Sequence, residues 1–397
     1  MSRRLAIDGG RPIRKTLLPY GRHWIAEDDI AAVASVLRSD WLTTGPAVAE
    51  FERVFATATG AASAVAVSSG TAALHAAMFA LGVGEGDEVI VPAMTFAATA
   101  NCVLYQGATP VFADVDDGTL LLGAVDAERR VTKRTKALVA VDYAGQPCDY
   151  DALADLAKRK QLALVADACH ALGAMYRGRR VGSLAQLSTF SFHPVKHIAA
   201  GEGGAVTTAE EPLARRLRLF RNHGITTDSR EREQTGSWQY EMVELGYNYR
   251  LTDLQCALAQ SQLKKLPAFL ASRREIARRY TAALADIPAV APLVVRTDAQ
   301  HAYHLFVVRL RLDQLRATRA QVFAALCAEG IGVNVHYVPV HLHPFYRKRL
   351  GTGPGLCPVA EAAYEEILSL PMFPAMSDAD VDDVIAALVK VTGAYSR

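Results

Sequence analysis

The chain has 397 residues, of which 51% are hydrophobic and 21% are charged, values typical of a globular protein with one large domain and a smaller one. Its 43 Lys and Arg residues nearly balance its 41 Asp and Glu residues, which leaves a formal net charge of +2 with no long run of one sign. This balance excludes a protein that binds nucleic acid non-specifically through a basic surface.

The N-terminal stretch MSRRLAIDGGRPIRK is basic but lacks the apolar centre of a signal peptide, so we expect no secretion. The cysteines form no CxxC pair and show no zinc-binding spacing, which indicates reduced, mostly buried thiols and no metal site. A cytoplasmic protein is therefore expected. The six cysteines are Cys102, Cys148, Cys169, Cys256, Cys327 and Cys357.

Residues 60–210 alternate short, continuously apolar runs with helical stretches. Parallel strands covered by helices on both faces have this pattern, because both faces of such a sheet are buried. We expect strands in SAVAVSS, DEVIVPA, TPVFADV, TKALVAVDY and LALVADA, and helices in GTAALHAAMFALG, FAATANCVLYQG and DALADLAKRKQ. The pattern predicts a large α/β domain with a mainly parallel sheet, to which we assign residues 20–255.

No charged residue occurs from Val89 to Ala113, a length that could cross a bilayer. The stretch contains Pro92 and Pro110, however, and its two ends are short runs rich in β-branched residues. We therefore predict a strand, a helix and a strand in a buried core, and no membrane span.

Residues 252–286 are expected to form two helices broken near Pro267. They lead into a second, smaller α+β domain, to which we assign residues 256–397. In it, HAYHLFVVRL is expected to be a strand, TRAQVFAALCAEG a helix that ends at Gly330, and IGVNVHYVP another strand.

Three features of the large domain indicate chemistry. Ser69, Gly70 and Thr71 follow an apolar run and open a helix, where hydroxyls and free backbone N–H groups could bind a phosphate. Asp167 ends a strongly apolar strand, so its carboxylate needs a cationic or hydrogen-bonding partner. Lys196 lies on a loop between two expected strands, with the glycines of GEGG just behind it.

Each residue also has an ordinary structural interpretation: Ser69 as a helix cap, Asp167 as a cap for the next turn, and Lys196 as a solvated loop lysine. Their joint order in an α/β domain nevertheless matches what pyridoxal 5′-phosphate (PLP) requires. The helix start would hold the phosphate, Asp167 would keep the pyridine nitrogen protonated, and Lys196 would hold the aldehyde as a Schiff base. No GxGxxG motif with an acidic residue at the expected distance follows a strand, which excludes a nicotinamide dehydrogenase.

Five segments resemble those of the DegT/StrS sugar aminotransferases, a family of fold type I PLP-dependent transferases. They are SSGTAALHAA, VPAMTFAATAN, DACHALGA, TFSFHPVKHIAAGEGGAVTT and GYNYRLTDLQCAL. Within this family, YGRHWI, LRSDWLTTGPAVAEFE, VDYAGQPCDY and VHYVPVHLHPFY are most similar to the branch that makes UDP-4-amino-4,6-dideoxy-N-acetyl-β-L-altrosamine in pseudaminic acid biosynthesis.

The resemblance implies the activity and the site residues. L-glutamate would give its amino group to the cofactor, which would pass it to the C4 ketone of a UDP-linked 4-keto-6-deoxy-N-acetylhexosamine. Lys196 would bind the cofactor and then move the proton, and Asn248 would come from the neighbouring subunit, so that a homodimer shares its active sites. The implied PLP contacts are Gly70, Thr71, Ala72, Phe96, Asp167, His170, Ser191, Lys196 and Asn248.

The implied substrate contacts are Tyr20, Asp40, Trp41, Leu42, Thr43, His336, Tyr337 and Tyr346. Tyr and His can donate hydrogen bonds to a diphosphate, and aromatic faces can cover uracil or sugar; as an alternative, Trp41 and Tyr337 are core or interface aromatics. Arginines in RLFRNHGI and at position 250 could receive a diphosphate or be structural ion-pair partners.

Other functions also stay open from the sequence. Transaminases for dTDP- or GDP-linked keto sugars would share this scaffold, and so would a dehydratase, although some relatives that remove a hydroxyl carry His where Lys196 stands. A non-catalytic regulatory protein on the same fold would bind no PLP.

Overall fold

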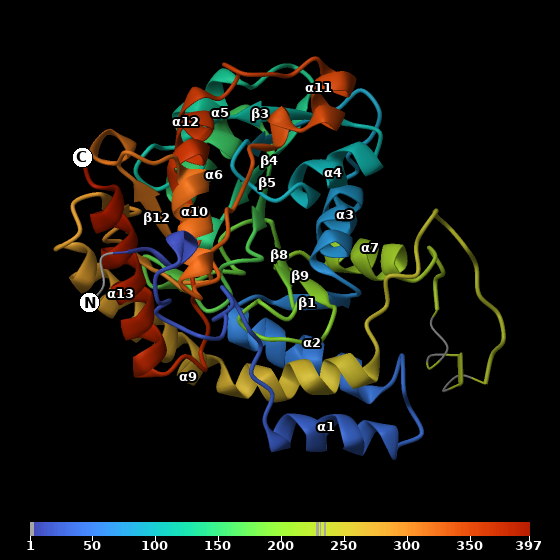
Figure 1. Cartoon of the computed structure of the whole chain (residues 1–397). Helices are drawn as coiled ribbons and strands as arrows, with labels where there is room; N and C mark the ends of the chain where they lie inside the picture. The colour runs from blue at the N-terminus through green and yellow to red at the C-terminus, as the bar shows by residue number, and fades with distance from the viewer. Residues whose placement is uncertain (1–3, 228–229, 231, 234–235) are drawn as a thin grey trace.

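The computed structural model describes residues 4–227, 230, 232–233 and 236–397. A seven-stranded sheet covered by helices forms the larger part of the molecule, and both chain ends lie on the side of a second, small sheet (Figure 1). In spatial order the strands of the large sheet are β1 (Ser63–Val67), β9 (Gly204–Thr208), β8 (Leu187–Ser191), β5 (Ala163–Asp167), β4 (Thr135–Val141), β2 (Glu88–Pro92) and β3 (Thr109–Ala113).

The large sheet is mainly parallel, as the apolar runs predict. The pairs β2/β3, β2/β4, β4/β5 and β5/β8 are parallel, whereas β9 is antiparallel to both of its neighbours. Strand β9 can reverse because the short segment 192–203 connects it directly to β8, without a crossover helix. Since β1 and β8 are both antiparallel to β9, the carboxyl ends of β1, β5 and β8 meet at one edge of the sheet.

The predicted alternation of strands and helices is confirmed, and residues Val89–Ala113 contain β2, a helix and β3. Among the described residues, no helix has both the length and the apolar character needed to cross a membrane. The helices around the large sheet are α2 (Pro46–Thr59), α3 (Gly70–Ala80), α4 (Ala98–Tyr105), α5 (Ala124–Arg129), α6 (Tyr150–Lys160) and α7 (Glu211–Arg221).

A second hydrophobic core lies around an antiparallel sheet of β10 (Val290–Pro292), β12 (Phe306–Leu310) and β13 (Ile367–Leu370). Leu5 and Leu18 from the N-terminal segment belong to this core. The division of the chain after residue 255 stays a prediction. The helices that follow residue 300 are α10 (Arg319–Ala328), α11 (Pro344–Leu350), α12 (Pro358–Glu366) and α13 (Asp378–Tyr395).

The remaining elements are short, apart from an N-terminal helix. They are α1 (Glu27–Leu37), β6 (Met175–Tyr176), β7 (Arg179–Arg180), β11 (Ala299–Gln300), and the 3-10 turns Ala6–Asp8, Tyr143–Gly145, Leu312–Gln314 and Val340–Leu342.

The prediction of two helices broken at Pro267 is wrong, because α9 runs without interruption from Asp253 to Leu284 with Pro267 inside it. An internal proline weakens a helix by about 3 kcal/mol. Here Leu266 and Phe269 are buried on either side of the proline. Tertiary packing of both halves therefore holds the helix together across it.

The predicted strand IGVNVHYVP is also absent as a regular strand. Its backbone forms only isolated bridges, from Ile331 to Leu18 and from Asn334 to Ser369. The two bridges keep the segment extended, but its later residues have no continuous strand partner. These later residues form an irregular wall beside the large sheet.

Candidate functional site

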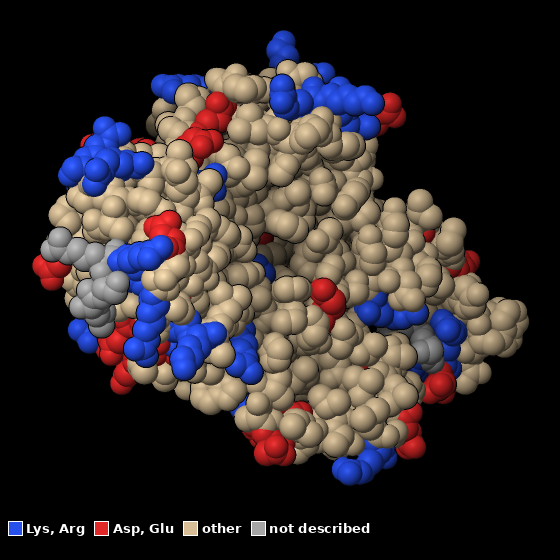
Figure 2. Space-filling model, viewed as in Figure 1, with Lys and Arg blue, Asp and Glu red and all other residues tan. Residues whose placement is uncertain are grey.

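A cavity of about 500 Å³ opens at the edge where the carboxyl ends of β5 and β8 meet the start of α3. Figure 2 shows this face of the molecule hollowed near its centre, over the region where Figure 1 draws β8. Ten of the residues predicted from the sequence line the cavity: Tyr20, Gly70, Thr71, Phe96, Asp167, His170, Ser191, Lys196, His336 and Tyr337.

Lys196 lies in the loop between β8 and β9, as predicted. Its backbone N–H donates to the carbonyl of His193 at 2.8 Å, and its Nζ lies 3.4 Å from Nε2 of His304. Burial lowers the pKa of the ammonium, while Cys169 and Asp167 act in the opposite direction. A lowered pKa makes a neutral, nucleophilic amine more accessible near pH 7 than for a solvated lysine.

Asp167 is the last residue of β5 and is only 6% exposed. Its Oδ2 accepts a 2.7 Å hydrogen bond from Oγ1 of Thr99, and its Oδ1 accepts a 3.3 Å bond from the N–H of Cys169. Within the described ranges, Asp167 forms no ion pair with a Lys, Arg or His side chain. A carboxylate this buried, held only by neutral donors, is suited to receive a cation from a bound molecule.

The start of α3 forms the opposite end of the cavity. Ser69 caps this helix, since its Oγ accepts a 3.0 Å hydrogen bond from the N–H of Ala72. The N–H groups of Gly70 and Thr71 belong to the first turn, where no intrahelical acceptor exists. A Cβ at Gly70 would lie 2.8 Å from Cβ of Ser191, so glycine lets the end of β8 approach the helix start. Capping and anion binding are therefore compatible here.

The third wall comes from the segment that follows α10. The hydroxyl of Tyr337 lies 3.0 Å from Nε2 of His170, and Phe96 approaches the Tyr337 ring with centroids 5.8 Å apart. Nδ1 of His336 lies 2.8 Å from Oγ of Ser369, and its ring contacts that of Tyr20 at 5.3 Å. Burial lowers the pKa of His336 to about 4, with a further contribution from Lys196. This wall is consequently aromatic and uncharged near neutral pH.

Several predicted residues do not line this cavity. Ala72 lies one residue beyond the cavity in the first turn of α3, and the buried Tyr346 donates its hydroxyl to Asn101. Residues 40–43 form a loop before α2, in which Thr43 forms an antiparallel bridge to Thr252. Asn248 is exposed and forms a bridge to Asn222.

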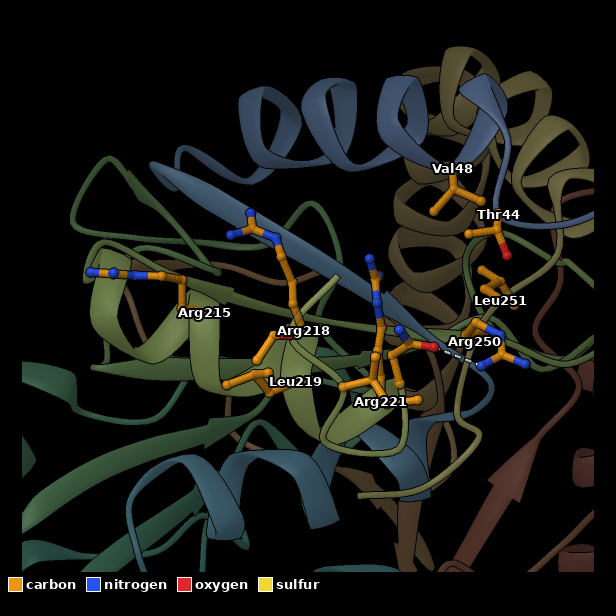
Figure 3. A pocket seen from close by; sticks show the side chains of 11 residues that line it. Thr44, Val48, Arg215, Arg218, Leu219, Arg221, Arg250 and Leu251 are labelled. Atoms are coloured by element: carbon orange, nitrogen blue, oxygen red, sulfur yellow. Dashed lines mark hydrogen bonds between the residues drawn. The ribbon is translucent and has the colours of Figure 1, made fainter. Parts of the chain in front are cut away.

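A second cavity, of about 450 Å³, lies beside these last residues and is rich in arginine (Figure 3). Arg221 is paired with Glu52, and Arg218 lies 3.4 Å from Glu211. Nη1 of Arg250 donates a 2.7 Å hydrogen bond to Oδ1 of Asn222, and this bond is drawn in Figure 3. Arg215 also lines the cavity, and no carboxylate in the described part of the chain pairs with it. The arginines that line this cavity therefore outnumber the carboxylates that pair with them.

The described residues between α7 and α9 extend away from the body of the molecule on the same side (Figure 1). Large apolar side chains in its described part are exposed, with Trp238 82% and Leu245 73% accessible. Exposed apolar side chains of this kind are available to contact a partner.

The sequence did not identify Thr99 or His304. The hydroxyls of Thr95 and Thr99 lie 2.7 Å apart, and Thr95 precedes the helix α4 in which Thr99 lies. The contact of Thr99 with Asp167 bridges 68 positions, and that of His304 with Lys196 bridges 108. No local pattern could have revealed either.

Comparison with known proteins adds independent findings. The model of the DegT/DnrJ/EryC1/StrS aminotransferase family matches residues 23–389. The spore coat polysaccharide biosynthesis protein SpsC of Bacillus subtilis strain 168 is 44% identical over 377 residues, which are 94% of this chain and 97% of SpsC.

Two solved structures have nearly the same fold. Spr1654 from Streptococcus pneumoniae in its PLP form has a TM-score of 0.89 and 33% identity, covering 95% of this chain and 99% of Spr1654. Helicobacter pylori PseC, an aminotransferase involved in the biosynthesis of pseudoaminic acid, has a TM-score of 0.89 and 30% identity, covering 96% of this chain and all 100% of PseC. These matches confirm the expected fold, that of the fold type I PLP enzymes.

The residues of the first cavity fit PLP. Asp167 supplies a buried carboxylate that forms no ion pair with the described side chains, which suits a protonated pyridine nitrogen. The first turn of α3 supplies unpaired N–H groups for a phosphate, next to Ser191. Lys196 supplies an amine of lowered pKa in the same cavity. These three groups thus match the ring nitrogen, the phosphate and the aldehyde of the cofactor.

Proposed function

We propose, from the premise that this chain belongs to the DegT/DnrJ/EryC1/StrS aminotransferase family and is a PLP-dependent sugar aminotransferase, that it acts on a UDP-linked keto sugar. L-glutamate is the amino donor, and the acceptor is the C4 ketone of a UDP-4-keto-6-deoxy-N-acetylhexosamine. The product is UDP-4-amino-4,6-dideoxy-N-acetyl-β-L-altrosamine. The observation that carries the proposal is the convergence of Lys196, the buried Asp167 and the α3 start in one cavity.

PLP, when bound, supplies an electron sink and carries the amino group between the two substrates. The proposed holding residues divide by position. Asp167 would pair with the ring nitrogen, Phe96 would pack against the ring, and His170 would interact with its phenolic oxygen. Gly70, Thr71, Ala72 and Ser191 would hold the phosphate.

Nζ of Lys196 has two tasks in this proposal. It anchors the cofactor between turnovers, and once free it takes a proton from one carbon and returns it to another. Its burial supports this role, because a lysine with a lowered pKa exchanges protons more readily near neutral pH. The loop backbone holds Lys196 at the edge of the sheet, so that its amine would approach the bound cofactor from one fixed side of the cavity.

Tyr20, His336 and Tyr337 form the proposed sugar end of the site. Their rings gather on one wall of the cavity that contains Lys196, and the low pKa of His336 keeps that wall neutral. A neutral aromatic wall suits a sugar ring and leaves the negative charge of the nucleotide to another part of the site.

We further propose a homodimer with shared active sites. Asn248 and residues 40–43 lie outside the cavity of their own chain, on the side of the exposed apolar segment. These residues would complete the active-site cavity of the partner subunit. The arginine-rich cavity of this chain, which Arg250 lines, would lie next to it and bind the diphosphate. Tyr346, buried against Asn101, would act only by supporting the cavity wall.

A second candidate is a transaminase for a dTDP- or GDP-linked keto sugar. The same cavity is compatible with it, since none of the wall contacts described above distinguishes one nucleotide base from another.

The six cysteines are free, and four of them are buried, which supports our proposal of a cytoplasmic location.

The decisive experiment is an assay of the purified protein with L-glutamate and UDP-, dTDP- and GDP-linked 4-keto-6-deoxy sugars, with products identified by mass spectrometry. Formation of the UDP-linked 4-amino sugar with the highest kcat/KM supports the proposal. Preference for another nucleotide selects the second candidate. Absence of PLP absorbance from the purified protein would contradict both.

A further inference from the structure

We infer that His304 holds the amine of Lys196 whenever that amine is not bonded to the cofactor. The inference rests on the proposed role of Lys196 and adds a positioning residue to it. A lysine that must release the cofactor and later capture it again needs a defined place to wait, because its four-carbon stem otherwise samples many rotamers.

The geometry places this waiting position at the imidazole of His304. Nε2 of His304 lies 3.4 Å from Nζ of Lys196, which is the hydrogen-bonding contact that the structure gives this amine. His304 is only 4% exposed, and its Nδ1 finds no partner among the described residues. Lys196 is therefore the polar partner toward which this ring is directed.

The charges around His304 keep its ring neutral. Burial holds the pKa of His304 well below its ordinary value, and Lys196, His170, His197 and Arg273 act in the same direction. A neutral imidazole offers a lone pair to an ammonium, whereas a protonated one would repel it. Cys169 and Asp167 oppose the lowering of the Lys196 pKa by burial, because both favour the charged form of the amine.

Packing fixes the ring in this position. Its centroid lies 4.4 Å from that of His170 and 5.8 Å from that of His197. The fully buried Arg273 donates Nη1 to the carbonyls of Tyr303 and His304 at 3.0 and 3.2 Å, and to that of Met372 at 3.0 Å. Arg273 thus joins α9, the segment before β12 and the segment after β13 at one point.

This arrangement explains why Arg273, which has no carboxylate partner in the described part of the chain, is buried behind the site. Arg273 satisfies carbonyls of a segment that forms no ladder before β12, and burial lowers its pKa to about 9. The N–H of Leu305 also donates to the carbonyl of Ala144 at 3.1 Å, which ties the segment to the turn after β4. His304 is consequently held by the backbone on both sides while its ring faces Lys196.

The test uses the full-length enzyme loaded with pyridoxamine phosphate, in which Lys196 is a free amine. Trinitrobenzenesulfonate labels neutral amines, and peptide mass spectrometry of Lys196 against pH gives its apparent pKa. His304→Phe keeps an aromatic ring against His170 but removes the acceptor. We expect the apparent pKa of Lys196 to fall by about 1 unit, which is about tenfold faster labelling below the pKa.

His304→Gln restores an acceptor oxygen and is expected to return the pKa most of the way to that of the wild type. The matched control is His301→Phe, a buried histidine of the same segment that faces Tyr303 rather than Lys196. It is expected to leave the labelling profile unchanged. In turnover, His304→Phe should lower kcat about tenfold with KM little changed.

A labelling profile of His304→Phe that coincides with that of the wild type would overturn the inference. If His304→Phe fails to show a cooperative melting transition, His304→Leu is measured instead with the same two outcomes. Failure of the proposed function is separate, because it is read from the sugar product of the wild type and not from the chemistry of Lys196.

Discussion

The hydroxyl of Thr99 donates a 2.7 Å hydrogen bond to Oδ2 of Asp167, joining the first turn of α4 to the end of β5. Thr99 is fully buried and also contacts the hydroxyl of Thr95 at 2.7 Å. The carboxylate proposed to face the cofactor is thereby aimed by a side chain from another layer of the fold.

Thr99→Val should misdirect Asp167 without changing the shape of the core. The loss of one hydrogen bond to a charged group corresponds to about 1.5–3 kcal/mol, so kcat should fall by about ten- to a hundredfold. Thr99→Ser keeps the hydroxyl and should retain activity within a few-fold. Steady-state kinetics and PLP binding titrations measure both variants, and normal kinetics of Thr99→Val would show that Asp167 needs no such support.

Lys196→Ala should abolish turnover, because no other amine lines the cavity among the described residues. The absorbance of lysine-bound PLP should disappear from the spectrum, while the thermal melting temperature stays close to that of the wild type, since the side chain makes only one hydrogen bond with the residues that the structure describes. A variant that still transaminates at the normal rate would remove the mechanism.

Asp167→Asn preserves the size of the side chain and removes its charge. The amide cannot stabilise a positive ring nitrogen, and losing a charged hydrogen bond of about 2–3 kcal/mol lowers kcat about 30- to 150-fold. Rapid-scan absorbance of the reaction with glutamate alone measures the first half-reaction directly. Unchanged rates in this variant would assign Asp167 a structural role.

Mixed dimers test whether Asn248 serves the partner's site. Neither Lys196→Ala nor Asn248→Ala should be fully active alone, but after subunit exchange a mixed dimer contains one site with both native residues. At equal amounts this restores about a quarter of the wild-type sites. If Asn248 acted within its own chain, every site would carry a defect and mixing would restore nothing.

Asp29 provides a prediction for stability. Its fully buried carboxylate accepts hydrogen bonds from Nζ of Lys265 at 2.6 Å, Nε2 of Gln262 at 2.7 Å and the N–H of Ala26 at 2.9 Å. Burial alone would raise the pKa of Asp29, but these partners hold it below the ordinary value of 3.8. A lowered folded pKa stabilises the protein at pH values above the unfolded pKa, and this contribution is lost as the pH falls through the folded pKa.

Asp29→Asn should therefore lower the free energy of unfolding by about 2 kcal/mol at pH 7, with a smaller difference from the wild type below about pH 4. Asp28→Asn is the matched control, since Asp28 contacts the same Lys265 but is 61% exposed, and should change stability by less than about 0.5 kcal/mol. Urea unfolding at pH 7 and pH 3 measures both. A pH-independent difference would mean that the charge of Asp29 is not the source of its effect.

Much of the fold could be predicted because its signals are local. The continuous apolar runs of β2, β4 and β5 predict a buried parallel sheet, and the glycines behind Lys196 predict the loop before β9. Where prediction failed, contacts distant in sequence decided the outcome. Pro267 is accommodated because both halves of α9 are packed, and the segment after Ile331 lacks a continuous strand partner.

The sequence by itself determined the order of the elements and the places of Asp167 at a strand end and Lys196 in the loop after a strand, because side-chain periodicity and glycine positions act over a few residues. Only the tertiary structure decided which groups meet these two residues, among them Thr99 at Asp167 and His304 at Lys196. Such neighbours depend on how layers pack over separations of 68 and 108 residues, which no local pattern encodes.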